Sequence, residues 1–130
     1  MSGAEEDVPR KLTGMAHVFA AAGYSWGGIS TLWREQAFRH EILAAAVICS
    51  QHLAFSVPVW EIVLQIVLIA ILLTAEALNT AIEKVVDHLS PGWSLFAKEA
   101  KDLGSAAVFF LLVANGLVAV IFWLAAFDLV

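Results

Sequence analysis

The chain has 130 residues, of which 61% are hydrophobic and only 15% are charged, and its formal net charge is −5. Soluble domains are ~45–50% apolar and ~25% charged, and a domain of this size buries only about two thirds of its surface, so the excess of apolar side chains must face lipid. The same figures exclude a disordered chain and a disulfide scaffold, and seven basic residues against twelve acidic ones provide no footprint for nucleic acid.

The first segment, residues 1–11, is a polar tail that carries Glu5, Glu6, Asp7, Arg10 and Lys11. A signal peptide needs a short apolar run behind a basic start and a small-residue cleavage site. Neither is present, so we expect the N-terminus to be retained. Residues 12–130 are predicted to form a single membrane domain.

Residues 12–38 have the spacing of an amphipathic helix. Apolar residues recur every three or four positions, at Leu12, Met15, Phe19, Ala22, Trp26, Ile29 and Trp33. A helix with tryptophans on one face and small polar residues on the other suits the membrane interface. The alternative is a soluble amphipathic helix packed on a core.

Three apolar segments follow, at residues 42–60, 62–88 and 101–127. Roughly 20 apolar residues span a bilayer as a helix, which each segment provides or approaches. The predicted fold class is therefore an all-α membrane protein, with an N-terminal amphipathic surface helix followed by three transmembrane helices.

The basic residues predict the orientation of these spans. All seven lie in the N-terminal part or in the connection between the second and third spans, at Arg10, Lys11, Arg34, Arg39, Lys84, Lys98 and Lys101. The positive-inside rule places both regions in the cytoplasm and the C-terminus outside. Arg34 and Arg39 are explained by this topology alone, without a role as ligands.

A polar stripe enters the second span from the cytoplasmic side. Glu76, Asn79, Glu83 and Asp87 follow at steps of 3, 4 and 4, which places them on one helix face. An ionisable group at membrane depth costs about 2.5–3.5 kcal/mol, so Glu76 is a functional candidate. Asp87, near the surface, could equally belong to a solvated helix end.

Aligned carboxylates repel one another unless a cation lies among them. A divalent metal is one candidate, because it prefers hard oxygen ligands, and Lys101 is another. Lys101, Asp102, Glu35 and Glu41 are expected at the same cytoplasmic level as the stripe. This convergence predicts a site for a metal and a polyanionic cytosolic substrate. No P-loop is present, but phosphoryl transfer is mostly positioning and charge neutralisation, and a carboxylate near the bilayer could deprotonate a lipid hydroxyl.

Three runs, AAGYSW…ISTLWREQAFRHE, EALNTAIEKVVD and AKDLGSAAV, together resemble the prokaryotic diacylglycerol kinase family over roughly residues 14–125. E-x-x-N-x-x-x-E followed by K-D-x-G-S is a specific combination. The resemblance implies a homotrimer with shared active sites in the bacterial cytoplasmic membrane. It also implies transfer of the γ-phosphoryl of MgATP to the primary hydroxyl of diacylglycerol, which gives phosphatidic acid.

The resemblance also implies roles for particular residues. Glu76 matches the general base, with Asn79 one turn away, and Glu35 and Glu83 match the Mg²⁺ ligands, Glu35 being donated across a subunit boundary. Lys101 and Asp102 match the pair that meets ATP, and the other matched ATP contacts are Tyr24, Gly92, Trp93 and Ser94. The matched lipid contacts are His17, Ser25, Trp33, Phe38, Arg39, Glu76 and Ser105.

Two departures and three alternatives remain. His17 stands where the best-known members carry arginine, and the spacing around Trp33 and Glu35 is one residue shorter.

Close relatives phosphorylate undecaprenol, which the local motifs do not separate from diacylglycerol. An ion or proton translocator would need polar residues on the outer side, where residues 62–73 offer only Gln65. A purely structural membrane protein would leave the stripe from Glu76 unexplained.

Overall fold

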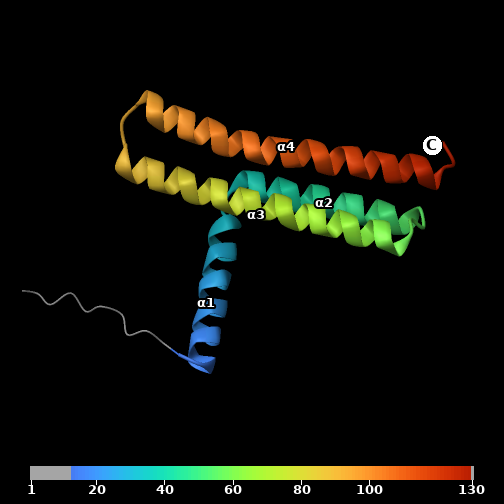
Figure 1. The fold of residues 1–130 in the computed structure, drawn as a ribbon, viewed down its shortest axis with the longest axis horizontal. Coiled ribbons are helices and arrows are strands. Elements are labelled where there is room, and N and C mark those ends of the chain that lie inside the picture. The colour runs from blue at the N-terminus through green and yellow to red at the C-terminus, as the bar shows by residue number, and fades with distance from the viewer. Residues whose placement is uncertain (1–12, 130) are drawn as a thin grey trace, which may run out of the picture. The chain divides into compact units, whose positions relative to one another are not determined.

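The computed structural model describes residues 13–129, and within them the chain is entirely helical (Figure 1). The helices are α1 (Met15–Leu32), α2 (Gln36–Ala54), α3 (Val59–Leu89) and α4 (Leu95–Ala126). The predicted tail, residues 1–11, lies outside the described residues. The chain forms two compact units, residues 1–31 and 32–130, and each is described by itself.

Helix α1 has no buried residue in its own unit. Its hydroxyl side chains bond back onto the helix, since Ser25 Oγ donates to the carbonyl of Ala21 (3.1 Å) and Thr31 Oγ1 donates to that of Gly27 (3.0 Å). The large apolar side chains of α1, among them Phe19 and Trp26, are exposed.

The single helix predicted over residues 12–38 is wrong at its C-terminal end, because the chain breaks after Leu32 and α2 begins at Gln36. Arg39 stabilises the break: its Nη1 donates to the carbonyls of Trp33 (3.2 Å) and Arg34 (3.3 Å). The ring of Phe38, which is buried, meets that of Trp33 edge to face with centroids 6.2 Å apart.

Helix α2 ends at Ala54, so the predicted boundary at residue 60 is also wrong. Ser56 adopts a positive φ of 53°, while its N–H donates to the carbonyl of Leu53 (3.3 Å) and the N–H of Val57 donates to that of His52 (3.0 Å). These paired bonds are the Schellman arrangement that closes helix C-termini. Pro58, which has no N–H to donate, then precedes α3.

Helices α3 and α4 are both long enough to cross a membrane. Their 31 and 32 residues correspond to about 46–48 Å, against a hydrocarbon core of ~30 Å. Only 22% of the most apolar window of each helix is buried, whereas the core helix of a soluble protein would be mostly covered. Within residues 13–129 these two helices alone meet the length and hydropathy criteria for a span, and α2 does not.

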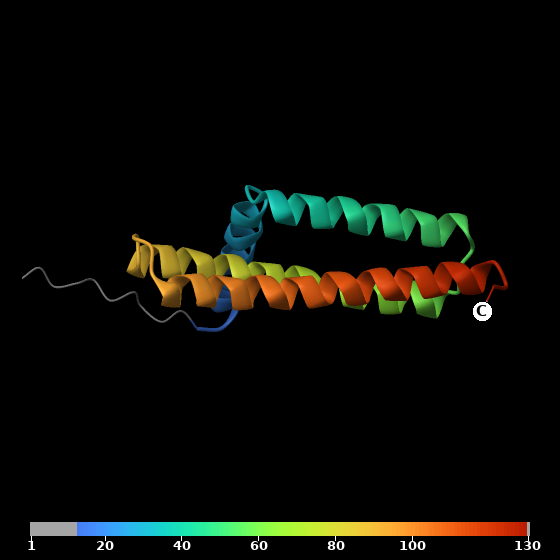
Figure 2. The same cartoon turned by 90° about the horizontal axis from the view of Figure 1, so that it is seen from above.

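Helices α2, α3 and α4 lie side by side along a common direction (Figures 1 and 2), with α3 in contact with both of the others. Gln65 on α3 and Asn115 on α4 join two of them: Gln65 Nε2 donates to Asn115 Oδ1 (2.9 Å). Asn115 Nδ2 in turn donates to the carbonyls of Leu68 (3.2 Å) and Leu111 (2.9 Å). This bonding fixes the register of α3 against α4.

A second polar contact fastens α2 to α4. His52, which is completely buried, accepts a hydrogen bond at Nδ1 from Trp123 Nε1 (3.1 Å), and its ring also packs edge to face on Phe122. Glu61 on α3 is buried as well. The end of the bundle that holds the C-terminus of α2 therefore contains buried polar groups, of which His52 Nδ1 is hydrogen-bonded while His52 Nε2 and Glu61 Oε2 have no partner in the described residues.

Candidate active site

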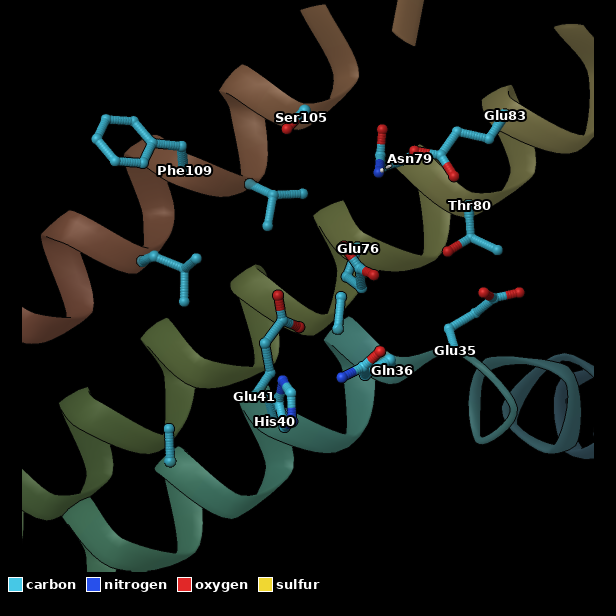
Figure 3. Close-up of a pocket in the computed structure, with 14 residues that line it drawn as sticks. Glu35, Gln36, His40, Glu41, Glu76, Asn79, Thr80, Glu83, Ser105 and Phe109 are labelled. Carbon is cyan, nitrogen blue, oxygen red and sulfur yellow. Dashed lines mark hydrogen bonds between the residues drawn. The ribbon is translucent and has the colours of Figure 1, made fainter. Parts of the chain in front are cut away.

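A cavity of about 760 Å³ opens between α2, α3 and α4, toward the N-termini of α2 and α4 and the C-terminal half of α3 (Figure 3). Its size falls in the range of small-molecule sites. We call it the acidic pocket. Its lining residues are Glu35, Gln36, Ala37, His40, Glu41, Ala44, Glu76, Asn79, Thr80, Glu83, Ser105, Val108, Phe109 and Leu112.

Four carboxylates dominate the acidic pocket, Glu35 and Glu41 from α2 and Glu76 and Glu83 from α3. No lysine or arginine is among its lining residues in the described part of the chain. The basic groups shown at the pocket are His40, which lines it, and Lys84, whose Nζ meets Glu35 Oε1 at 3.1 Å. Because like charges in one cavity repel, the pocket requires protons or a bound cation to neutralise it.

Glu76 lies deepest in the helix pair and is only 4% exposed. Glu41 faces it from α2, as Figure 3 shows, and is itself buried with Oε2 lacking a hydrogen-bond partner. Two carboxylates that are buried face to face repel one another, so this part of the pocket has the greatest need of a proton or a cation.

Asn79 lies between Glu76 and Glu83 along α3. Its Nδ2 donates to Glu83 Oε1 (3.1 Å), while its Oδ1 is buried without a partner. Asn79 packs against Gly104 on α4: a Cβ at that glycine would overlap Asn79 Oδ1 and lie 3.3 Å from its Cγ. Only glycine permits this approach, which explains the glycine of the K-D-x-G-S motif.

The oxygen-rich lining fits Mg²⁺. Proteins bind this ion through a few carboxylates, and water and substrate phosphates complete its coordination. Glu35 and Glu83 would supply the carboxylates, whereas Asn79 Oδ1 lies against Gly104 on α4. No group of three or more acidic, histidine or cysteine side chains in residues 13–129 is arranged to hold a metal by itself. The two carboxylates fit a metal that arrives with a nucleotide.

Glu35 reaches this pocket within a single chain, although the resemblance implied donation across a subunit boundary. The structure thus brings together Glu35, Glu76, Asn79, Glu83 and Ser105 of the predicted site. The remaining predicted residues do not line the acidic pocket.

Of the predicted nucleotide-binding residues, Glu35 and Glu83 line the pocket, whereas Ser94, Lys101 and Asp102 lie outside it. Lys101 pairs with Asp87, and Asp102 pairs with Lys98. Ser94 is the N-cap of α4, since its Oγ accepts from the N–H of Ala97 (3.1 Å). In the connection between α3 and α4 the carbonyl of Gly92 accepts from Ser90 Oγ (3.5 Å) and Trp93 is exposed, and Tyr24 is exposed in the first unit.

Several predicted lipid contacts have structural contacts in the chain itself. Phe38 and Trp33 pack on one another, and Arg39 binds backbone carbonyls. His17 and Ser25 are exposed on α1. Only Ser105 and Glu76 of that set line the pocket.

The sequence predicted Glu41 at the cytoplasmic level of the site but gave it no role, and it did not assign Gln36, His40, Thr80 or Gly104 to the site. Gln36 and His40 share a face of α2, and their spacing of four was visible in the sequence. Only the packing of α2 against α3 shows that this face lines the pocket.

Carboxylates buried where α3, which is apolar enough to span a membrane, packs against α2 are typical of an integral membrane enzyme. The sequence profile described as prokaryotic diacylglycerol kinase matches residues 23–123. Diacylglycerol kinase of a Sinorhizobium species is 45% identical over 109 residues, which is 84% of this chain and 80% of that protein. Diacylglycerol kinase of Escherichia coli K12 is 38% identical over 116 residues, covering 85% and 88% of the two chains.

A more distant relative, diacylglycerol kinase of Helicobacter pylori, is 30% identical over 120 residues, which cover 90% of this chain and 86% of that protein. The chain belongs to the prokaryotic diacylglycerol kinase family. It is a membrane lipid kinase.

Proposed function

We propose that the protein transfers the γ-phosphoryl group of MgATP to the primary hydroxyl of diacylglycerol at the cytoplasmic face of the membrane. The observation that carries the proposal is the acidic pocket, in which a buried glutamate at the boundary of an apolar span faces further carboxylates. An uncharged lipid hydroxyl can approach such a group from the bilayer, and a charged nucleotide can approach from the water.

Glu76 is the proposed general base. Its carboxylate accepts the proton of the lipid hydroxyl as the hydroxyl oxygen attacks the γ-phosphorus, while the bond to the β-phosphate oxygen breaks and ADP leaves. The products are phosphatidic acid, ADP and the proton on Glu76. Asn79, one turn along α3, holds Glu83 through its amide and keeps the two acids apart.

Glu35 and Glu83 are the proposed ligands of the magnesium ion, which when bound neutralises the β- and γ-phosphates. Lys101 would meet the transferred phosphate after exchanging Asp87 for it, and Asp102 lies next to it in the chain. Tyr24, Gly92, Trp93 and Ser94 are proposed to contact ATP. Phosphoryl transfer needs mainly this positioning and charge neutralisation.

His17, Ser25, Trp33, Phe38, Arg39 and Ser105 are proposed to contact the lipid. Ser105 has the clearest support, because its side chain lines the pocket on α4, two turns from the apolar Leu112. His17 and Ser25 belong to α1, Trp33 to the break that follows it, and Phe38 and Arg39 to the first turn of α2. An amphipathic helix on the membrane surface would meet lipid headgroups there.

The proposed assembly is a homotrimer in the bacterial cytoplasmic membrane, with three spans per chain and a cytoplasmic N-terminus. α2 would be the first span, although it is more polar than α3 and α4. A neighbouring copy would shield its polar residues from lipid, and the exposed apolar faces of α3 and α4 provide surfaces for such packing.

Undecaprenol is the competing acceptor. The deciding experiment is ATP-dependent phosphorylation in mixed micelles that contain either diacylglycerol or undecaprenol, with the Glu76→Gln variant as control. We expect phosphatidic acid that is absent with the variant. Phosphate transferred only to the polyprenol would change the substrate and keep the mechanism. Transfer to neither lipid by folded protein would refute the proposal and favour an ion translocator.

A further inference from the structure

Two side chains with nitrogen hydrogen-bond donors, Gln36 and His40, lie on one wall of the acidic pocket. Gln36 and His40 of α2 are four residues apart and therefore lie one above the other on the same helix face. Figure 3 shows both at the pocket beside Glu41. Within residues 13–129, neither side chain makes a hydrogen bond to protein. Both are therefore available to a ligand.

The other walls offer a different chemistry. α4 contributes Val108, Phe109 and Leu112, which are apolar, together with the hydroxyl of Ser105. The pocket's carboxylates accept hydrogen bonds when ionised. One N–H of the Asn79 amide donates to Glu83, and Thr80 adds a second hydroxyl to the lining. Among the lining side chains with nitrogen donors, Gln36 and His40 are the two that make no hydrogen bond within the described residues.

The position of Glu76 determines what such donors would meet. A lipid whose hydroxyl reaches Glu76 places the groups a few bonds from that hydroxyl against the pocket walls. In diacylglycerol these groups are ester carbonyls, which only accept hydrogen bonds. In a polyprenol they are hydrocarbon, and the donors would be left facing an apolar chain, which costs free energy.

We propose that Gln36 and His40 form an ester-reading pair that donates to the acyl carbonyls of the acceptor lipid and selects a diacylglycerol over an acceptor without ester groups. The proposal rests on the proposed function, since it places the hydroxyl at Glu76. The apolar wall of Val108, Phe109 and Leu112 takes the beginning of the acyl chains opposite the pair.

The test compares two acceptors that differ only in the carbonyl groups: 1,2-diacylglycerol and its 1,2-dialkyl ether analogue with chains of the same length. The enzyme is the full chain in lipid nanodiscs. Variants Gln36→Leu and His40→Leu remove a donor at similar size, and the matched controls Gln36→Asn and His40→Gln retain an N–H. The readout is the ratio of kcat/KM for the diester to that for the diether.

We expect the native enzyme to prefer the diester. Each leucine variant should lower the ratio about fivefold, which is the effect of one neutral hydrogen bond, and the double variant should bring it close to one. The donor-retaining controls should keep most of the preference. Undecaprenol should behave like the diether in this series.

Two outcomes would overturn the ester-reading pair. The first is a native enzyme that does not distinguish diester from diether, or leucine variants that slow both acceptors equally. The second is a change in the KM for ATP in the leucine variants while the ratio of diester to diether stays the same. That result would assign the two donors to the nucleotide. Absence of any lipid phosphorylation by the native enzyme would instead refute the proposed function, so the two failures are distinguishable.

Discussion

Replacing Gly104 by alanine tests the closest contact between α3 and α4 in the acidic pocket. The added methyl group would overlap Asn79 Oδ1 and lie 3.3 Å from Asn79 Cγ. Asn79 has only two side-chain torsions and its amide is held by Glu83 (3.1 Å), so the whole side chain must move by about 1 Å or lose that bond.

The size of the effect follows from these contacts. Misplacement of a catalytic group by about 1 Å can cost ~100-fold in rate, so we expect Gly104→Ala to lower kcat about 10- to 100-fold. Stability should change less. Overpacking costs roughly 1–3 kcal/mol, but alanine in place of glycine within a helix returns about 1 kcal/mol.

The assay is initial-rate phosphorylation of diacylglycerol, with thermal unfolding measured in parallel. Gly116→Ala is the matched control, because it lies on the same helix and a Cβ there meets no atom within 4 Å. That control should keep its activity. In an Asn79→Ala background Gly104→Ala should have little further effect, since the clash is gone. Full activity in Gly104→Ala, or equal losses in both glycine variants, would refute the reasoning.

Three further predictions concern charge and buried polarity. Glu83→Gln should raise the Mg²⁺ concentration needed for half-maximal activity severalfold, and an unchanged metal titration would remove it from the ligand set. Glu41 is buried facing Glu76, so Glu41→Gln removes a repulsion between two carboxylates and should raise Tm in Mg²⁺-free buffer; an unchanged or lower Tm would contradict this. Asn115→Leu should destabilise the protein by about 1–2 kcal/mol, because it leaves the amide of Gln65 without its hydrogen-bond partner. Adding Gln65→Leu should recover part of this loss. Additive losses in the double variant would show that the two residues are not coupled.

The apolar segments and the polar stripe were predictable from the sequence because both depend on periodicity. Glu76, Asn79 and Glu83 share a face of α3 at helical spacing, and the structure places all three in one pocket. The helical class was predictable for the same reason, and the all-helical structure confirms it.

Local backbone hydrogen bonds decided the boundaries that the sequence reasoning missed. The hydropathy of residues 42–60 is nearly continuous, yet Ser56 in the left-handed region and the bond from Val57 to His52 end α2 at Ala54. Similarly, the break before α2 is stabilised by Arg39 bonding to two carbonyls, a role that composition does not reveal.

Packing between helices decided the rest of the site. Gly104 appeared in the sequence only as part of a motif, and its role is defined by Asn79 on a different helix. Gln36 and His40 are exposed residues of α2, and they line the pocket only because α2 packs against α3 beside the cavity. Such relations depend on contacts between residues far apart in the chain, which the spacing within one helix does not contain.

Single-turnover phosphorylation of diacylglycerol by Glu76→Gln, with MgATP binding measured on the same preparation, tests the central claim most directly. If Glu76 is the base, the variant binds MgATP as the native protein does, while the rate of phosphatidic acid formation falls by at least about 100-fold, as loss of a general base requires. Native single-turnover rates in the variant would contradict the account, and so would a loss of MgATP binding as large as the loss of rate.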